Sequence, residues 1–240
     1  MSDIAEDKKA AAKQAISFVL DDMVVGLGTG STAFFAIKIL GEKVAAGLQI
    51  KGVPTSLVTA HLAHECGIPL LAEFDKIDLT IDGADEVDPQ GNLIKGGGGA
   101  LTREKIVAAA SEKEIVIVDF SKQVMRLGKF PLPVEVLPFG LKYVVSQLRK
   151  DFACEVRIRK SGDEAFRTDN GNYIVDCEFN QIVDPAELTV HLNNIPGVVD
   201  NGLFVGLTDL VIVGKGAGEA ETILFDRKKS DARENPHHPL

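Results

Sequence analysis

The sequence predicts an α/β protein, with a Rossmann-like catalytic domain on a parallel sheet and a smaller inserted α+β domain of the ferredoxin-like type. Short runs of β-branched residues alternate with segments of helical spacing over the first 120 residues or so. Such alternation is typical of a parallel sheet that helices cover on both faces. The pattern changes after Gly128, and a strand-like run returns at 209–213.

The first half contains the elements of the expected parallel sheet. The strand-like runs, such as the one that contains Val24 and Val25, are short and apolar, as in buried parallel strands. In the first expected helix, the apolar residues Ala12, Ile16 and Val19 follow a helical spacing. Helices are expected at 5–20, 32–46, 57–66 and 101–110, and strands at 23–27, 48–53, 68–71, 77–81 and 115–118.

The smaller domain is expected to occupy residues 130–203, so that 1–129 and 204–240 form the larger one. Prolines between Phe130 and Pro138 indicate a crossing between the two. Asn170-Gly171 lies between two strand-like runs and predicts a hairpin turn. Helices are expected at 141–150 and 185–193, strands at 154–159, 173–179 and 209–213, and a frayed tail at 226–240.

Composition narrows the class of function. The chain has 240 residues, 45% of them apolar, and a net charge of −9, which disfavours nucleic acid or an anionic membrane as a partner. No apolar run approaches a membrane span, and the acidic first residues do not resemble a signal peptide. Three widely spaced cysteines fit a reducing cytoplasm. His61 and His64 have helical spacing but no third ligand in sight, so no metal site is predicted.

A first glycine-rich segment, Gly26 to Thr32, joins a predicted strand to a predicted helix. Glycines allow close approach of the backbone, and the free amides of a helix N-terminus bind anions. The segment is therefore a candidate phosphate cradle, unless it is a tight turn in which Ser31 or Thr32 caps the helix. It is no dinucleotide fingerprint, because Ser31 replaces the third glycine, and it lacks the Gly-Lys-Ser/Thr of a P-loop.

A second segment concentrates groups that can move protons. Asp82 and Asp85 follow a strand, Lys95 precedes four glycines, and Glu104 lies in the first turn of the next helix. Carboxylates transfer protons, and a lysine beside bare amides can stabilise an oxyanion, so the segment predicts proton transfer next to a carbonyl. In the alternative interpretation, the aspartates form turns and Glu104 only complements the helix dipole, in a helix capped by Thr102.

Several motifs, in order along the chain, resemble ribose-5-phosphate isomerase of type A. They are Gly28-Thr29-Gly30-Ser31-Thr32, Asp82-Gly83-Ala84-Asp85-Glu86, Lys95-Gly96-Gly97-Gly98, Leu101-Thr102-Arg103-Glu104-Lys105, Gly128-Lys129-Phe130-Pro131-Leu132-Pro133-Val134-Glu135-Val136, Asn194-Ile195-Pro196-Gly197-Val198-Val199 and Asn201-Gly202-Leu203-Phe204. The resemblance covers nearly the whole chain and ends near Phe225.

The resemblance implies interconversion of ribose 5-phosphate and ribulose 5-phosphate through an enediolate, in the pentose phosphate pathway, without metal or cofactor. Glu104 would be the base, with a pKa above its ordinary value. Lys95 would stabilise the enediolate, Asp82 would assist ring opening, and Asp85 would bind sugar hydroxyls or share that proton work. The implied substrate-binding residues are Thr29, Gly30, Ser31, Thr32, Asp82, Gly83, Ala84, Asp85, Lys95, Gly96, Gly97, Gly98 and Lys122.

Some assignments stay open at this stage. Lys8 could reach the phosphate, although Lys9 and Lys13 compete for that role, and Lys215 lies in a phosphate-friendly sequence that matches no family motif. Family likeness suggests a homodimer or homotetramer. Two other functions compete with the isomerase: a sugar-phosphate sensor without turnover, which would not need Glu104 and Lys95 together, and an acyl-transfer or amino-sugar enzyme.

Overall fold

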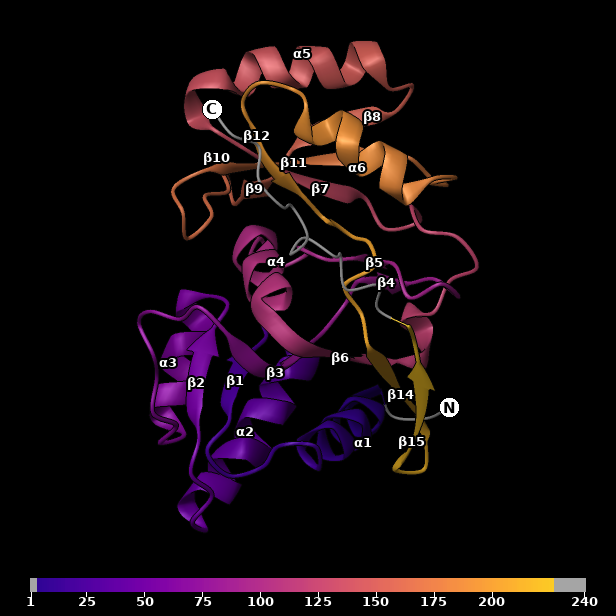
Figure 1. Ribbon diagram of the computed structural model, residues 1–240. Coiled ribbons are helices and arrows are strands. Elements are labelled where there is room, and N and C mark those ends of the chain that lie inside the picture. The colour runs from indigo at the N-terminus through magenta and orange to yellow at the C-terminus, as the bar shows by residue number, and fades with distance from the viewer. Residues whose placement is uncertain (1–3, 227–240) are drawn as a thin grey trace, which may run out of the picture.

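The computed structural model describes residues 4–226, which form two stacked parts built on separate sheets (Figure 1). The larger part contains a six-stranded sheet in the order β15-β14-β6-β3-β1-β2. The five strands from β14 to β2 are parallel, and β15 adds an antiparallel edge. The strands are β1 (Val24–Leu27), β2 (Lys51–Pro54), β3 (Ile77–Asp82), β6 (Ser111–Asp119), β14 (Leu210–Gly216) and β15 (Glu219–Leu224).

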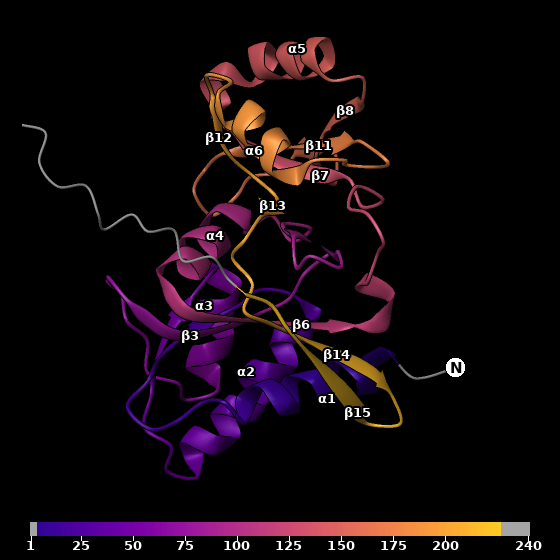
Figure 2. The same cartoon turned by 45° about the vertical axis from the view of Figure 1, so that its right-hand side comes forward.

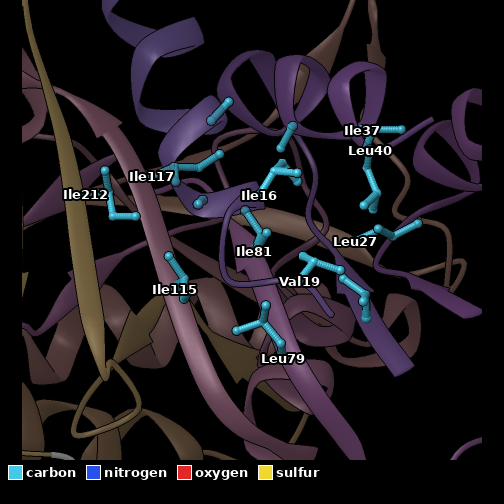
Figure 3. Packing of buried hydrophobic residues seen from close by; sticks show 14 of the residues in the cluster. Ile16, Val19, Leu27, Ile37, Leu40, Leu79, Ile81, Ile115, Ile117 and Ile212 are labelled. Atoms are coloured by element: carbon cyan, nitrogen blue, oxygen red, sulfur yellow. The ribbon is translucent and has the colours of Figure 1, made fainter. Parts of the chain in front are cut away.

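Side chains of the central strands alternate between the two faces of this sheet. Ile115 and Ile117 of β6 pack with Ile16 of the first helix, as Figure 3 shows, whereas Val116 and Val118 pack in a separate cluster on the opposite face. Burial on both faces explains why these strands read as continuous apolar runs in the sequence. The helices are α1 (Ile4–Ile16), α2 (Ser31–Ala45), α3 (Leu57–Glu65) and α4 (Leu101–Ala110).

Helix α4 lies between the two parts, whereas α1 and α2 cover the far face of the large sheet (Figure 1). Val107 of α4 packs against Val53 and Ile77 of the large sheet. The same helix also contacts the sheet of the smaller part. Beside it runs a three-stranded sheet of β4 (Glu86–Val87), β5 (Leu93–Ile94) and β13 (Leu203–Phe204).

The smaller part has the chain order β-α-β-β-α-β and the strand order β12-β7-β11-β8, all antiparallel, which is the ferredoxin-like arrangement. Figure 2 shows α5 and α6 against this sheet, on the side away from α4. Its elements are β7 (Leu132–Val136), η2 (Pro138–Gly140), α5 (Leu141–Asp151), β8 (Glu155–Ile158), β9 (Lys160–Ser161), β10 (Glu164–Ala165), β11 (Tyr173–Glu178), α6 (Pro185–Asn193) and β12 (Val198–Asn201).

The fold class is thus confirmed, while several elements differ from expectation. Residues 68–71 form no strand; Leu70 only bridges to Gly52. The proline-rich stretch contains β7, a central strand, and the carbonyl of Pro133 in it still accepts a hydrogen bond from Gly202. The expected hairpin at Asn170-Gly171 does not join β8 directly to β11, because β9 and β10 lie between them. It instead connects Arg167 and Tyr173, which form an isolated antiparallel bridge.

The division into 1–129 with 204–240 and 130–203 stays a prediction, although each part has its own buried apolar cluster. Residues 227–240, which include most of the expected tail, lie outside the described residues. Across residues 4–226, none of the helices combines the length and the apolar character needed to cross a lipid bilayer.

The strand order reverses beside β1, since β2 lies on one side of it and β3 on the other. In open α/β sheets, ligands bind at such a switch point, outside the carboxyl ends of the strands. The loops that follow β1 and β3 at this edge are those that contain Gly28 to Thr32 and Asp82 to Asp85.

Candidate active site

A pocket opens at this carboxyl edge of the large sheet. It is lined by Thr29, Gly30, Ser31, Thr32, Gly83, Ala84, Asp85, Lys95, Gly96, Gly97, Gly98, Glu104 and Lys122. The lining comes from five separate stretches of the sequence, and it includes every predicted site residue except Asp82.

The first glycine loop forms one wall of the pocket, at the N-terminus of α2. Gly30 is the N-cap and has a φ of +115°, a left-handed conformation that favours glycine. No described side chain caps the helix, so the alternative in which Ser31 or Thr32 caps it is wrong. The amides of the first turn are therefore available to bind an anion.

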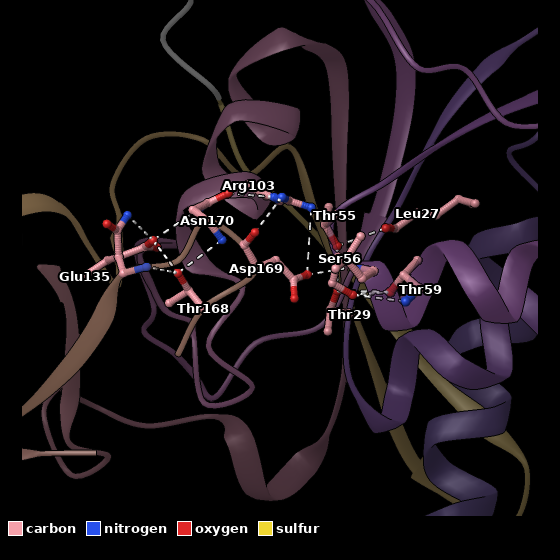
Figure 4. A network of polar contacts seen from close by, with 12 residues as sticks. Leu27, Thr29, Thr55, Ser56, Thr59, Arg103, Glu135, Thr168, Asp169 and Asn170 are labelled. Atoms are coloured by element: carbon pink, nitrogen blue, oxygen red, sulfur yellow. Dashed lines mark hydrogen bonds and ion pairs between the residues drawn. The ribbon is translucent and has the colours of Figure 1, made fainter. Parts of the chain in front are cut away.

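Thr29 is fixed from behind by a cluster of hydroxyl groups. Its Oγ1 lies 2.7 Å from Thr55 Oγ1, 2.8 Å from Ser56 Oγ and 3.0 Å from Thr59 Oγ1 (Figure 4). Thr55 and Thr59 also donate to the carbonyls of Leu27 and Gly28. Sequence analysis missed this cluster, whose only signal was the hydroxyl-rich run directly after β2.

Asp82, Lys95 and Glu104 form a buried chain of charges, in which Lys95 and Glu104 line the pocket and Asp82 lies behind them. Lys95 Nζ lies 2.9 Å from Asp82 Oδ2 and 3.5 Å from Glu104 Oε2, and the three side chains are only 2%, 1% and 5% exposed, respectively. Among the described residues, Glu104 Oε2 has no hydrogen-bond partner. The Glu104 side chain lines the pocket, and a carboxylate in such a position can accept a proton from a bound ligand.

Burial controls the protonation of these groups. It raises the pKa of Glu104 to about 8; the Lys95 ammonium opposes the rise and the Asp82 carboxylate adds to it. For Lys95, burial acts to lower the pKa, but the carboxylates of Asp82 and Glu104 outweigh it and the pKa is raised. Lys95 therefore stays charged at neutral pH, while Glu104 can exchange a proton.

Asp82 does not line the pocket but contacts residues that do. Its Oδ1 accepts hydrogen bonds from the amides of Thr29 at 3.0 Å and Gly83 at 2.7 Å, and its Oδ2 faces Lys95. A β-carbon on Gly28 would lie only 2.1 Å from Asp82 Oδ1, so the two loops require glycine where they meet. Asp82 thus links the cradle to the lysine.

Asp85 lines the pocket and contacts the second glycine loop. Its Oδ2 accepts a hydrogen bond from the Gly97 amide at 2.7 Å. Burial raises the pKa of Asp85, although the Gly97 amide and the Lys95 charge offset part of the rise. Gly98 also lines the pocket, and no described residue accepts a hydrogen bond from its amide.

The structure separates the candidate lysines. Lys122 lines the pocket from η1 (Phe120–Lys122), whose N-cap Asp119 accepts a hydrogen bond from the Ser121 amide. Lys8 Nζ donates to Ser31 Oγ at 2.9 Å, which places it beside the cradle without lining the pocket. Lys215 instead pairs with Glu221 on the β14–β15 hairpin.

The smaller part of the molecule holds the residues on both sides of Glu104. Thr102 Oγ1 donates to Glu135 Oε2 of β7 at 2.6 Å, so Thr102 does not cap α4 as expected; the N-cap is Ala100. Arg103 Nε donates to Asn170 Oδ1 at 2.8 Å. Figure 4 shows the contact of Arg103 with Asn170 in a polar network that extends through Asp169, which accepts a hydrogen bond from the Leu57 amide, to the region of Ser56 near the cradle.

Lys105 completes this attachment of α4. Its Nζ lies 2.6 Å from both Asp200 Oδ1 and the Asn201 carbonyl oxygen at the end of β12. Thus Thr102, Arg103 and Lys105 bind three different segments of the smaller part, while Glu104 faces the pocket.

Comparison with known proteins agrees with this architecture. Residues 51–218 match the family model of ribose 5-phosphate isomerase A (phosphoriboisomerase A). The chain is also 51% identical over 223 residues to ribose-5-phosphate isomerase A of Bradyrhizobium diazoefficiens, covering 88% of this chain and 92% of the relative. This chain belongs to the ribose 5-phosphate isomerase A family.

Other members of the ribose 5-phosphate isomerase A family support the same assignment. The Gloeobacter violaceus protein is 54% identical over 215 residues, covering 88% of this chain and 93% of the relative. A solved D-ribose-5-phosphate isomerase in complex with phospho-erythronic acid superposes with a TM-score of 0.89 at 44% identity, covering 92% and 99% of the two chains. The Plasmodium falciparum enzyme gives a TM-score of 0.88 at 40% identity, with the same coverage.

Proposed function

We propose that this chain interconverts D-ribose 5-phosphate and D-ribulose 5-phosphate by general-base proton transfer through an enediolate. Family membership supports the reaction. The observation that carries the mechanism is Glu104, a buried carboxylate with a raised pKa that lies beside the Lys95 ammonium and lines a pocket that also contains an anion cradle.

The cradle binds the phosphate at one end of the pocket. The amides at the start of α2 and the hydroxyls of Thr29, Ser31 and Thr32 supply donors, and the helix dipole favours the negative charge. Lys8 adds a positive charge through its contact with Ser31, and Lys122 adds another from η1. The anion is thereby bound in spite of the net charge of −9 on the chain.

At the other end, the Glu104 carboxylate removes the proton from C2 of the open-chain aldose. The electron pair forms the C1–C2 double bond and leaves negative charge on O1. Glu104 then returns the proton to C1, C2 becomes the carbonyl carbon, and the proton of the C2 hydroxyl passes to O1. The Lys95 ammonium and the amides of the second glycine loop stabilise the charge on the intermediate.

Ring opening requires a group that can exchange a proton with the furanose oxygen. Asp85 suits this role better than Asp82, because Asp85 lines the pocket and its pKa is raised. Asp82 is 1% exposed and its oxygens are occupied by Lys95 and two amides. We therefore assign Asp82 to holding Lys95 and Thr29 in place.

The competing functions fit less well. A sensor without turnover would need the cradle, but it has no use for a buried base beside a buried lysine. An acyl-transfer enzyme could use Glu104 as a nucleophile, but the pocket combines that glutamate with a phosphate cradle, which suits a short phosphosugar.

The decisive test is conversion of ribose 5-phosphate by the purified protein with EDTA present, beside Glu104→Gln. We expect turnover in the wild type and a loss of about 10²-fold or more in kcat for the variant, because the amide cannot accept the proton. Binding of ribose 5-phosphate without turnover in the wild type would favour the sensor. Turnover of a CoA thioester without pentose isomerisation would favour acyl transfer.

The family resemblance and the cysteine usage also suggest a cytoplasmic enzyme that associates with copies of itself as a homodimer or homotetramer.

A further inference from the structure

Arg159, which follows β8 in the smaller part, reaches across to the second glycine loop. Its Nη1 donates to the carbonyl oxygens of Gly96 at 2.8 Å and Gly97 at 3.0 Å. Its Nε donates to Asp176 Oδ2 at 2.9 Å, and its Nη2 pairs with the other oxygen of the same carboxylate. The side chain is only 14% exposed, so the guanidinium is ordered by partners on two sides.

These contacts decide where the loop amides point. In a planar trans peptide unit, the C=O and the N–H point in opposite directions. The carbonyl of Gly97 shares its peptide unit with the amide of Gly98. When Arg159 holds that carbonyl, the Gly98 N–H is directed away from the guanidinium. Gly98 lines the pocket, and its amide has no acceptor among the described residues.

The neighbouring peptide unit is held in the same way. The Gly96 carbonyl faces Arg159, while the Gly97 amide donates to Asp85. Phe166 closes the end of the loop, because its ring lies where a β-carbon on Gly99 would be, and the Arg159 guanidinium is 5.9 Å from the same ring. Contacts from outside the loop thus restrain its flexible glycines.

Arg159 also changes the strength of the Gly98 donor. A cation bonded to the carbonyl of a peptide unit polarises that unit, and its N–H becomes a better hydrogen-bond donor. One polarised chain therefore runs from the Asp176 carboxylate through the Arg159 guanidinium to the Gly97–Gly98 peptide unit at the pocket.

We propose that Arg159, held by Asp176, is a positioning residue that aims the Gly98 amide at the enediolate oxygen and strengthens it as a donor. This inference rests on the proposed isomerase function and deepens it: the smaller part of the molecule completes the oxyanion site. Because the oxyanion exists only during the reaction, Arg159 contributes to turnover and not to substrate binding.

The test compares Arg159→Met with Arg157→Met. Arg157 lies two residues earlier in the same segment, but it is 62% exposed and pairs with Glu155 and Glu178. We expect Arg159→Met to lower kcat about 10- to 100-fold with KM within about twofold, since an oxyanion donor is misaligned but not removed. Arg157→Met should keep both constants. Arg159→Lys should recover part of the loss, because one ammonium can bind one carbonyl without the fork.

Binding of two anions provides a second readout. The two carboxylate oxygens of phospho-erythronic acid can occupy the positions of the two enediolate oxygens. Inorganic phosphate, in contrast, occupies only the cradle. Arg159→Met should weaken inhibition by phospho-erythronic acid and leave inhibition by phosphate unchanged. The inference is overturned if kcat matches that of Arg157→Met, if only KM rises, or if Tm falls while kcat is retained.

Failure of the proposed function would look different. A wild type that does not isomerise ribose 5-phosphate removes that function, and with it this role of Arg159, before any variant is compared. A wild type that turns over, with an equally active Arg159→Met, removes the inference alone.

Discussion

At the scale of single residues, the proposed chemistry depends on how two buried carboxylates share one lysine. Lys95 contacts both Asp82 and Glu104, but it is closer to Asp82: its Nζ lies 2.9 Å from Asp82 Oδ2 and 3.5 Å from Glu104 Oε2. Burial of the charged glutamate is therefore only partly compensated, which explains its raised pKa. A fully paired Glu104 would be a weaker base at neutral pH.

The raised pKa predicts a particular pH dependence. Glu104 must be deprotonated to accept the C2 proton, so kcat/KM should increase with pH through an acid limb near the raised pKa of about 8, far above the ordinary glutamate value of about 4.3. A profile of kcat/KM against pH for the wild type measures the midpoint. An acid limb at the ordinary glutamate pKa would contradict the assignment of Glu104 as a base with a raised pKa.

At the scale of elements, the position of α4 depends on the buried carboxylate of Glu135 in β7. Its two oxygens accept hydrogen bonds from Thr102 of α4 and from Thr168, Asn170 and Asn172 of the chain that precedes β11. The side chain is fully buried. Four donors converge on one charge, so this network fixes both the helix that contains Glu104 and the turn that contacts Arg103.

Glu135→Gln should therefore destabilise the protein. The substituted amide places an NH2 donor against an existing donor, which leaves a buried polar group unsatisfied at a cost of about 1–3 kcal/mol in the free energy of unfolding. Urea denaturation measures this cost, with Glu155→Gln as the control, since Glu155 is exposed. Equal unfolding free energies for the two variants would show that the network does not stabilise the fold.

At the scale of the whole molecule, the active site belongs to both parts. The larger part supplies the residues that line the pocket, and the smaller part holds α4 and the second glycine loop through Glu135, Asp200 and Arg159. The reacting groups of the larger part are therefore held by contacts from both parts.

Self-association is the prediction that belongs to this scale. Light scattering coupled to size exclusion should give a mass of two or four times the chain mass of 25.7 kDa. The mass should not change over a tenfold dilution in the micromolar range if the assembly is stable. A mass equal to one chain would contradict the proposed homodimer or homotetramer.

The sequence by itself determined the fold class and the composition of the pocket. The glycines and hydroxyl residues that follow β1, and the carboxylates that follow β3, are recognisable from short stretches of sequence. In addition, the carboxyl ends of parallel strands meet at one edge of the sheet. Those two facts bring the predicted residues together without knowledge of side-chain contacts. The sequence also indicated the ferredoxin-like insertion, but its prolines concealed strand β7. A proline can lie in a strand where the pairing needs no amide from that residue, so prolines alone did not exclude a strand there.

Only the tertiary structure decided which residues support the site. Arg159 and Gly96 are 63 residues apart, and Thr102 and Glu135 are 33 apart, so no local pattern relates them. Asp82 and Asp85 look alike in sequence, yet one is buried against Lys95 and the other lines the pocket. Burial and long-range hydrogen bonds set these roles, and both arise only when the two sheets pack on α4.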